Sequence, residues 1–161
     1  MSIKIQNILP QLILDSRGFP TIEAEVHLTD GSIGRACVPS GASTGDKEAL
    51  ELRDRGAAWM GKGVNKACDN IINQIKPALL NEDPFNIQKI DQRMIDLDGT
   101  ENKSKLGANA ILAVSLANVK AGANSLQQNL YQYIYKSINI KPKVYPQHIL
   151  PTPMMNILNG G

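Results

Sequence analysis

Aromatic residues are scarce in this sequence, at 4% of its 161 residues. A hydrophobic core with so few rings has to be built from aliphatic side chains and alanine. The remaining composition is ordinary, since 42% of the residues are hydrophobic and 20% are charged, as in soluble globular proteins. A chain of this length can bury one hydrophobic core of its own.

Cysteine is also rare, and Cys37 and Cys68 are the two that the chain contains. They form no Cys-x-x-Cys pair and no histidines cluster beside them, so the sequence indicates neither a redox motif nor a zinc site. A disulfide between them stays possible. We expect two buried free thiols in a reducing compartment, because free cysteine packs as a small apolar side chain.

The sequence has neither an excess of charge nor a long apolar run. Its net charge is +2 and like charges form no block, which argues against binding nucleic acid or an anionic membrane. The first residues lack the apolar region of a signal peptide. The longest charge-poor stretch, residues 106–119, is too short and too polar to span a bilayer. We therefore expect a cytoplasmic protein with no nucleic-acid or membrane partner.

The beginning of the chain has the pattern of β-strands. Apolar and polar residues alternate over 22–28, as in a strand with one buried face. Asp30-Gly31 predicts a tight hairpin turn, and residues 33–38 return as the next strand. Residues 3–14 supply another strand, which we expect to be interrupted at Pro10.

Helical patterns follow. Apolar residues recur at three- and four-residue steps over 64–79, which is typical of an amphipathic helix. Residues 107–124 are small and apolar on nearly every side, so we expect that helix at the centre of the helical layer. The remaining predicted helices are a short charged one over 46–54, one that begins at Asp83-Pro84 and ends near Gly99, and one over 130–135.

The order of these elements predicts an α+β fold, in which a three-stranded antiparallel sheet is followed by a four-helix layer. We expect this domain to cover residues 1–138. Residues 139–161 carry four prolines, which indicates a linker, and residues 154–158 have the pattern of a strand that begins a second domain.

The segment Val38–Gly45 joins the predicted sheet to the helices and is rich in glycine, serine and threonine. It contains no side chain that acts as an acid, base or nucleophile without help. Its hydroxyls and unobstructed N–H groups are suited to closing over an anion or a metal ion. A solvated turn is the structural alternative.

Other polar groups are expected to have structural roles. Residues 56–62 have P-loop spacing, but Gly63 stands where such a loop has its serine or threonine. Glu23 and Glu25 share a strand face, where a solvated pair is a better interpretation than an acid–base pair. The remaining candidates are expected in turns, in the linker or on solvated surfaces: His27, His148, Asp96, Asp98, Glu48, Glu51, Arg53, Asp54 and Arg55.

Five motifs together carry a family resemblance: Leu14–Gly18, Val38–Gly45, Leu97–Ser104, Leu106–Leu112 and Asn156–Gly161. With these motifs in this order, the chain resembles the enolase family over nearly its whole length. The resemblance implies dehydration of 2-phosphoglycerate to phosphoenolpyruvate in glycolysis, with Mg²⁺ as cofactor. It also implies a homodimer or larger homo-oligomer, in which an N-terminal α+β domain packs against a barrel that holds the catalytic groups.

The resemblance assigns a lid loop over the substrate: Ser40, Gly41, Ala42, Ser43, Thr44 and Gly45. Ser43 stands where the family's serine binds the second Mg²⁺ once the lid loop has closed. Arg17 matches an arginine near the family's subunit interface, and we expect it to anchor structure. No catalytic residue is expected within the chain, so the chain alone is predicted to be inactive.

Two hypotheses of different classes stay open. The chain is either the N-terminal lid domain of an enolase or a stand-alone module that binds a partner or supports assembly without catalysis. Residues 155–161 look like part of the first barrel strand. A domain that had evolved to stand alone would have no reason to keep them, so they favour the first hypothesis.

Overall fold

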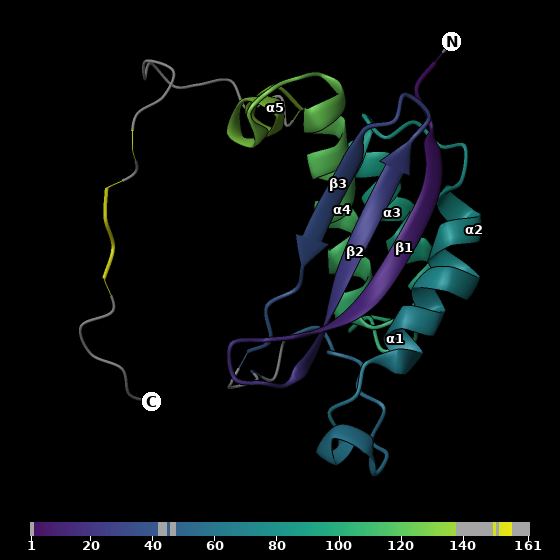
Figure 1. Cartoon of the computed structure of the whole chain (residues 1–161), viewed down its shortest axis with the longest axis vertical. Coiled ribbons are helices and arrows are strands. Elements are labelled where there is room, and N and C mark those ends of the chain that lie inside the picture. Colours follow the sequence, from purple (N-terminus) through teal and green to yellow (C-terminus); the bar gives the residue numbers. More distant parts are fainter. Residues whose placement is uncertain (1, 42–44, 46–47, 138–149, 151, 156–161) are drawn as a thin grey trace.

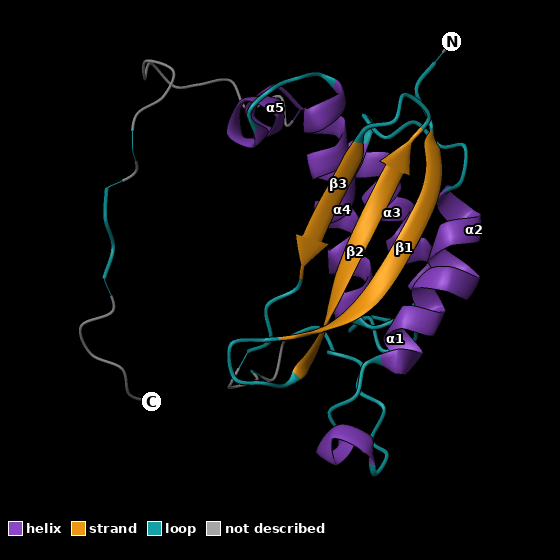
Figure 2. Ribbon diagram, viewed as in Figure 1, coloured by secondary structure: helices purple, strands orange, loops and turns teal. Residues whose placement is uncertain are grey.

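The computed structural model describes residues 2–41, 45, 48–137, 150 and 152–155. Within these residues the predicted α+β fold is confirmed. A three-stranded antiparallel sheet lies on one side of the domain, and the helices pack against one face of this sheet (Figure 2). The chain runs through the sheet first and then through the helices (Figure 1).

The sheet has the order β1-β2-β3, from β1 (Ile5–Leu14), β2 (Pro20–Leu28) and β3 (Ile33–Cys37). The predicted interruption at Pro10 is wrong, because β1 is continuous and Pro10 pairs with Ala24 of β2. Proline has no N–H to donate, but β1 is an edge strand, where that loss is tolerated.

The helical part of the domain corresponds to the four predicted helices. The first is a run of α1 (Asn65–Asn70), the π-helical turn η2 (Ile71–Ile75) and α2 (Lys76–Leu79), and it ends close to its predicted boundary. Pro77 explains the irregular turn η2. A proline within a helix has no N–H to donate to the carbonyl one turn earlier, and its ring pushes that carbonyl away. The remaining helical elements are the 3₁₀ turn η1 (Ala58–Gly61), α3 (Ile87–Asp98), α4 (Ala108–Ser125) and α5 (Leu130–Ser137).

The core lies between the sheet and α4, as the small apolar residues of α4 predict. The inward-facing residues of β2 are fully buried: Ile22, Ala24, Val26 and Leu28. At Gly34 the backbone of β3 lies very close to α4, because a Cβ atom there would be 2.1 Å from the carbonyl oxygen of Ala117. Only glycine allows β3 to pack this tightly on α4.

The predicted short helix over residues 46–54 is wrong for its described part, residues 48–54, which contain no helical turn. The N–H of Leu50 donates to the carbonyl of Asn102 at 2.7 Å, and the carbonyl of Leu50 accepts from the N–H of Ala108 at 2.8 Å. These backbone groups bond to a distant segment, so they do not bond within a local helix.

Two further expectations concern burial and the end of the chain. Both cysteines are free, but Cys37 is exposed and Cys68 is only partly buried, so the prediction that both are buried is wrong for Cys37 and holds in part for Cys68. Burial raises the pKa of the Cys68 thiol to about 11.

The predicted linker and second-domain strand lie mostly outside the described residues, so the boundary at residue 138 stays a prediction. Among the described helices, none is long and apolar enough to cross a membrane.

Candidate functional site

The lid loop begins directly after β3 and the short segment Val38–Pro39. The structure describes three of its members, Ser40, Gly41 and Gly45, while Ala42, Ser43 and Thr44 lie outside the described residues. The predicted metal ligand Ser43 therefore stays a prediction. What the structure defines is how both flanks of the lid loop are held.

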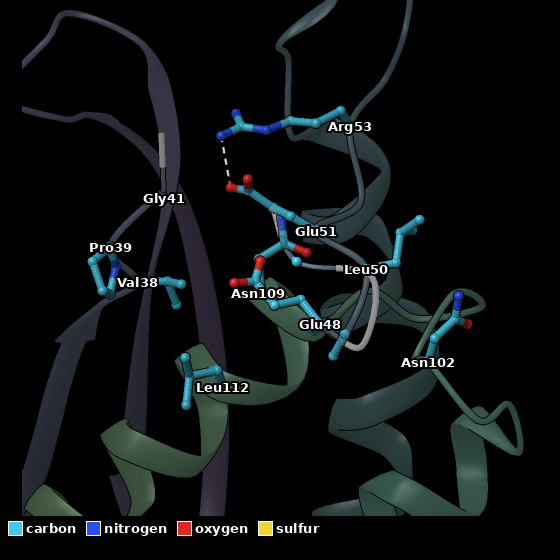
Figure 3. A pocket seen from close by; sticks show the side chains of 13 residues that line it. Val38, Pro39, Gly41, Glu48, Leu50, Glu51, Arg53, Asn102, Asn109 and Leu112 are labelled. Atoms are coloured by element: carbon cyan, nitrogen blue, oxygen red, sulfur yellow. Dashed lines mark hydrogen bonds and ion pairs between the residues drawn. The ribbon is translucent and has the colours of Figure 1, made fainter. Parts of the chain in front are cut away.

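The first flank lies between two hollows in the surface. One cavity, of about 550 Å³, is lined by Val38, Pro39, Glu51 and Asn109 among others (Figure 3). A second cavity, of about 560 Å³, is lined by Val38 and Pro39 together with the β1–β2 turn. This arrangement leaves space on both sides of the segment that leads into the lid loop.

Arg17 anchors the start of the lid loop to the turn between β1 and β2. Its guanidinium donates to the carbonyl of Ser40 at 2.8 Å. Asp15 holds the turn itself, since its carboxylate accepts from the N–H groups of Arg17 and Phe19 at 2.9 and 2.8 Å. The Phe19 N–H is the main cause of a lowered Asp15 pKa. The anchoring role expected for Arg17 is thus visible in its contacts.

The second flank is held against the start of α4. The side chain of Asn109 accepts from the N–H of Leu52 and donates to its carbonyl, each at 3.1 Å. Gly107 allows this contact, because its φ is +96° and a Cβ atom there would lie 2.6 Å from the Cβ of Leu52. Residues 50–52 are therefore held beside the start of α4 and form no helical turn.

Charged and amide side chains converge on the first cavity. Arg53 and Glu51 form an ion pair of 2.6 Å on one side, and Glu48, Asn102 and Asn109 add further oxygen atoms to the lining (Figure 3). Among the described residues, however, no three histidine, cysteine, aspartate or glutamate side chains are grouped to hold a metal ion.

Comparison with known proteins identifies the fold and its relatives. The model of the family described as "Enolase, N-terminal domain" matches residues 5–134. The chain belongs to the enolase family. The enolase of Streptococcus thermophilus is 53% identical over all 161 residues, and that of Elusimicrobium minutum (strain Pei191) is 56% identical over 158 residues, or 98% of this chain. Enolase 1 of Lactococcus lactis subsp. cremoris (strain SK11) is 52% identical over 161 residues.

The chain spans 36% of the length of each of these enolases. The matched family domain begins with β1 and ends within α5. It therefore includes the sheet, the helical layer and both flanks of the lid loop. The resemblance inferred from the motifs is confirmed.

The other acidic candidates of this enolase domain have structural partners. The Nε of Arg35 lies 3.0 Å from a carboxylate oxygen of Glu23 and 3.0 Å from one of Glu25. Glu23 is only 8% exposed, so the expected solvated pair is wrong for this residue. Arg35 compensates both charges, which fits the structural role predicted for the pair.

His27 and Asp98 also bond within the domain. The Nε2 of His27 lies 3.0 Å from a Glu25 oxygen, and this contact is the main cause that lowers the Glu25 pKa. Asp98 is buried at the end of α3 and accepts from the N–H of Leu106 at 2.7 Å. Neither side chain is poised for acid–base chemistry. His148 lies outside the described residues.

The P-loop-like segment is a projecting hairpin, in which Asp54 N–H donates to the Gly63 carbonyl at 2.9 Å. No strand precedes it among the described residues 48–57, so the arrangement differs from a P-loop. Asp54 instead accepts from the N–H groups of Asn65 and Lys66 at 3.0 and 2.9 Å. It therefore caps the first turn of α1 from eleven residues upstream.

Sequence reasoning missed the importance of Glu51, Arg53 and Asn109. The predicted helix placed Glu51 and Arg53 on a solvated face. In the structure both side chains are largely buried beside the lid loop, with 33% of the Glu51 side chain and 16% of the Arg53 side chain exposed. One signal was present. Leu50-Glu51-Leu52-Arg53 alternates apolar and charged residues, which indicates an extended segment rather than a helix.

Proposed function

We propose that this chain is the lid-bearing N-terminal part of an enolase, phosphopyruvate hydratase, which dehydrates 2-phosphoglycerate to phosphoenolpyruvate in glycolysis. The observation that carries the proposal is the match of the whole chain to enolases at 52–56% identity. The anchored flanks of the lid loop support it, since a lid needs fixed ends about which to close.

The proposed role of the lid loop is to close over the substrate and exclude water, which strengthens electrostatic interactions within the site. The catalytic base, acid and primary metal ligands are proposed to belong to the barrel, which corresponds to the remaining length of the relatives. Residues 139–161 are proposed as the linker and the start of that barrel.

The proposed cofactor is Mg²⁺, which in enolase-type sites stabilises the negative charge of the enediolate when bound. The described residues of this chain do not by themselves form a site for it, since they contain no group of three candidate ligands. Ser43 is the one ligand that we propose from this chain. A homodimer or larger homo-oligomer in the cytoplasm completes the proposal.

A chimera tests the proposal directly. In it, this chain replaces the corresponding residues of the Streptococcus thermophilus enolase, which match it over 161 residues. We expect the purified chimera to convert 2-phosphoglycerate with Mg²⁺ at a rate within about tenfold of the parent enzyme, a difference of about 1.4 kcal/mol in activation free energy. The chain alone should give no turnover above a buffer blank.

The alternative function is a binding or assembly module without catalysis. It predicts a chimera that folds, as judged by a cooperative melting transition, but that has no dehydratase activity. A folded and inactive chimera would overturn the enolase proposal and leave this alternative.

A further inference from the structure

The hairpin formed by residues 54–63 projects from the sheet and the helical layer, and its tip is apolar (Figure 1). Residues 55–60 are all exposed, with Trp59 at 45% and Met60 at 79% of their full exposure. The 3₁₀ turn η1 at the tip adds no buried residue to the core. An indole ring and a thioether that remain so exposed are suited to contact with another molecule.

The backbone of this tip is strained. Trp59 and Met60 have φ values of +55° and +53°, in the left-handed region that residues other than glycine, asparagine and aspartate rarely adopt. Two consecutive bulky residues in this region are disfavoured, and their side chains are not buried in exchange. Strained backbone of this kind is found mainly at functional sites.

The hairpin is nevertheless held in one conformation. The N–H of Arg55 donates to the carbonyl of Gly61 at 3.1 Å, and that of Lys62 donates to the carbonyl of Trp59 at 2.9 Å. The guanidinium of Arg53 donates to the carbonyl of Lys62 at 2.6 Å. The tip is therefore preorganised, which lowers the conformational entropy that a binding partner would have to remove.

An apolar hollow borders the β1–β2 turn. This cavity, of about 560 Å³, lies between the end of β1 and the segment that follows β3. Its apolar lining comes from Ile13, Leu14, Val38 and Pro39. Leu14 is 55% exposed, so the hollow is open to an apolar side chain from another molecule.

The β1–β2 turn connects the hairpin to the hollow. The Nζ of Lys62 lies 3.5 Å from the centroid of the Phe19 ring in this turn. The guanidinium of Arg53 bonds the carbonyls of Pro20 and Lys62, both at 2.6 Å. Residues 15–17 of the same turn line the hollow. The apolar tip and the apolar hollow therefore belong to one end of the domain.

We propose that this end is a contact surface between two copies of the chain, in which the Trp59–Met60 tip of each copy enters the hollow of the other. A two-fold contact needs a self-complementary surface, because residue i of one copy meets residue j of the other and j meets i. A projecting tip and a hollow on one end of one chain meet this condition, whereas a different partner would need only one of them. This surface would form the homo-oligomer of the proposed function, on which the inference rests.

Association of the chain alone is the first test. The tip is short, so the contact is at the small end of protein–protein interfaces and the dimer should be weak. Sedimentation velocity from about 1 μM to about 1 mM covers the corresponding range of dissociation constants. We expect the sedimentation coefficient to rise from that of a monomer towards that of a dimer.

A double variant, Trp59→Asn with Met60→Asn, separates association from folding. Asparagine tolerates left-handed backbone better than the residues it replaces, so the variant should melt no lower than the unmodified chain. It lacks both apolar side chains and should associate at least about thirtyfold more weakly. The matched control is Ile72→Ala, at an apolar side chain that is 46% exposed on the helical layer, and it should associate as before. An unchanged dissociation constant in the double variant overturns the inference.

Cross-linking identifies the surface itself. A benzophenone-bearing phenylalanine replaces Trp59 in an equal mixture of ¹⁴N- and ¹⁵N-labelled chains. On irradiation we expect mixed-isotope products that join position 59 to residues 13–17 or 38–39. Products of a single isotope, products at other segments, or a chain that stays monomeric at about 1 mM overturn the inference. Dehydratase activity is not measured here, so an inactive chimera would overturn the proposed enolase function while these products still decide the contact surface.

Discussion

The side-chain amide of Asn109 bonds both backbone groups of Leu52, at 3.1 Å each, across 57 residues of sequence. Its oxygen and nitrogen thereby replace the partners that a neighbouring strand would supply. Asn109 is 3% exposed, so water cannot take over either bond. Together with the bond from the Ala108 N–H to the Leu50 carbonyl, this side chain attaches the second flank of the lid loop to α4.

Replacing Asn109 by alanine should destabilise the domain by about 1–3 kcal/mol, because it leaves the partly buried N–H and carbonyl of Leu52 without their partner. Urea unfolding followed by circular dichroism measures the change. The control is Asn65→Ala, at an exposed asparagine whose substitution should cost less than about 0.5 kcal/mol. Equal stability of the two variants would contradict the role assigned to Asn109.

Gly34→Ala should destabilise the packing of β3 on α4. The added methyl group would lie 2.1 Å from the carbonyl oxygen of Ala117, so helix and strand must move apart. Overpacking of this kind costs about 1–3 kcal/mol. Thermal unfolding provides the measurement, and Gly56→Ala is the control because a Cβ atom there has no neighbour within 4 Å. A melting temperature of Gly34→Ala equal to that of the control would show that the contact is not tight.

Asp98 should make folding depend on pH. Burial raises the pKa of Asp98, but hydrogen bonds from Thr100 and from the Leu106 N–H lower it by more. The pKa of Asp98 in the folded protein therefore lies below the usual 3.8. A carboxylate with a depressed folded pKa stabilises the fold above the unfolded pKa. That contribution is lost as the pH falls from about 4 through the folded pKa.

Asp98→Asn tests this dependence, because the amide keeps the shape and loses the charge. At pH 6 we expect a loss of about 1–3 kcal/mol in unfolding free energy. At pH 3 the difference in unfolding free energy between the variant and the unmodified chain should be smaller. At that pH the unmodified chain has itself lost part of the stabilisation by the Asp98 carboxylate. Asp96→Asn, at an exposed residue bonded to Gln92, serves as control. An equal difference in unfolding free energy at both pH values would show that the charge of Asp98 does not stabilise the fold.

Ser43→Ala tests the proposed metal ligand in the active chimera. A ligand made only after the lid loop has closed should affect kcat more than substrate binding. We expect kcat to fall at least tenfold, or about 1.4 kcal/mol, with the activity optimum at higher Mg²⁺ concentration and an unchanged melting temperature. Ser104→Ala removes an exposed hydroxyl elsewhere and should do none of this. Unchanged kcat and Mg²⁺ dependence would mean that the lid loop is a solvated turn.

Local patterns were enough to predict most of the elements. The alternation over 22–28 indicated the central strand, and its inward residues are fully buried in the structure. The small apolar residues of 107–124 placed α4 against the sheet. Pro10 was misleading, because its effect depends on whether a strand lies at the edge of a sheet, and only the pairing of strands decides that.

The sequence by itself determined the family and the α+β order of the elements, and it located the segment proposed as the lid loop, because these depend on motifs and on short-range periodicity. Tertiary structure decided how that loop is held. Leu50 and Leu52 form no local helix because Asn102, Ala108 and Asn109 bond to them from more than 50 residues further along the chain. Arg53 binds Ser40 only because the fold brings Pro20 and Lys62 to the same guanidinium. Such bonds join residues far apart in sequence, so a local pattern does not predict them.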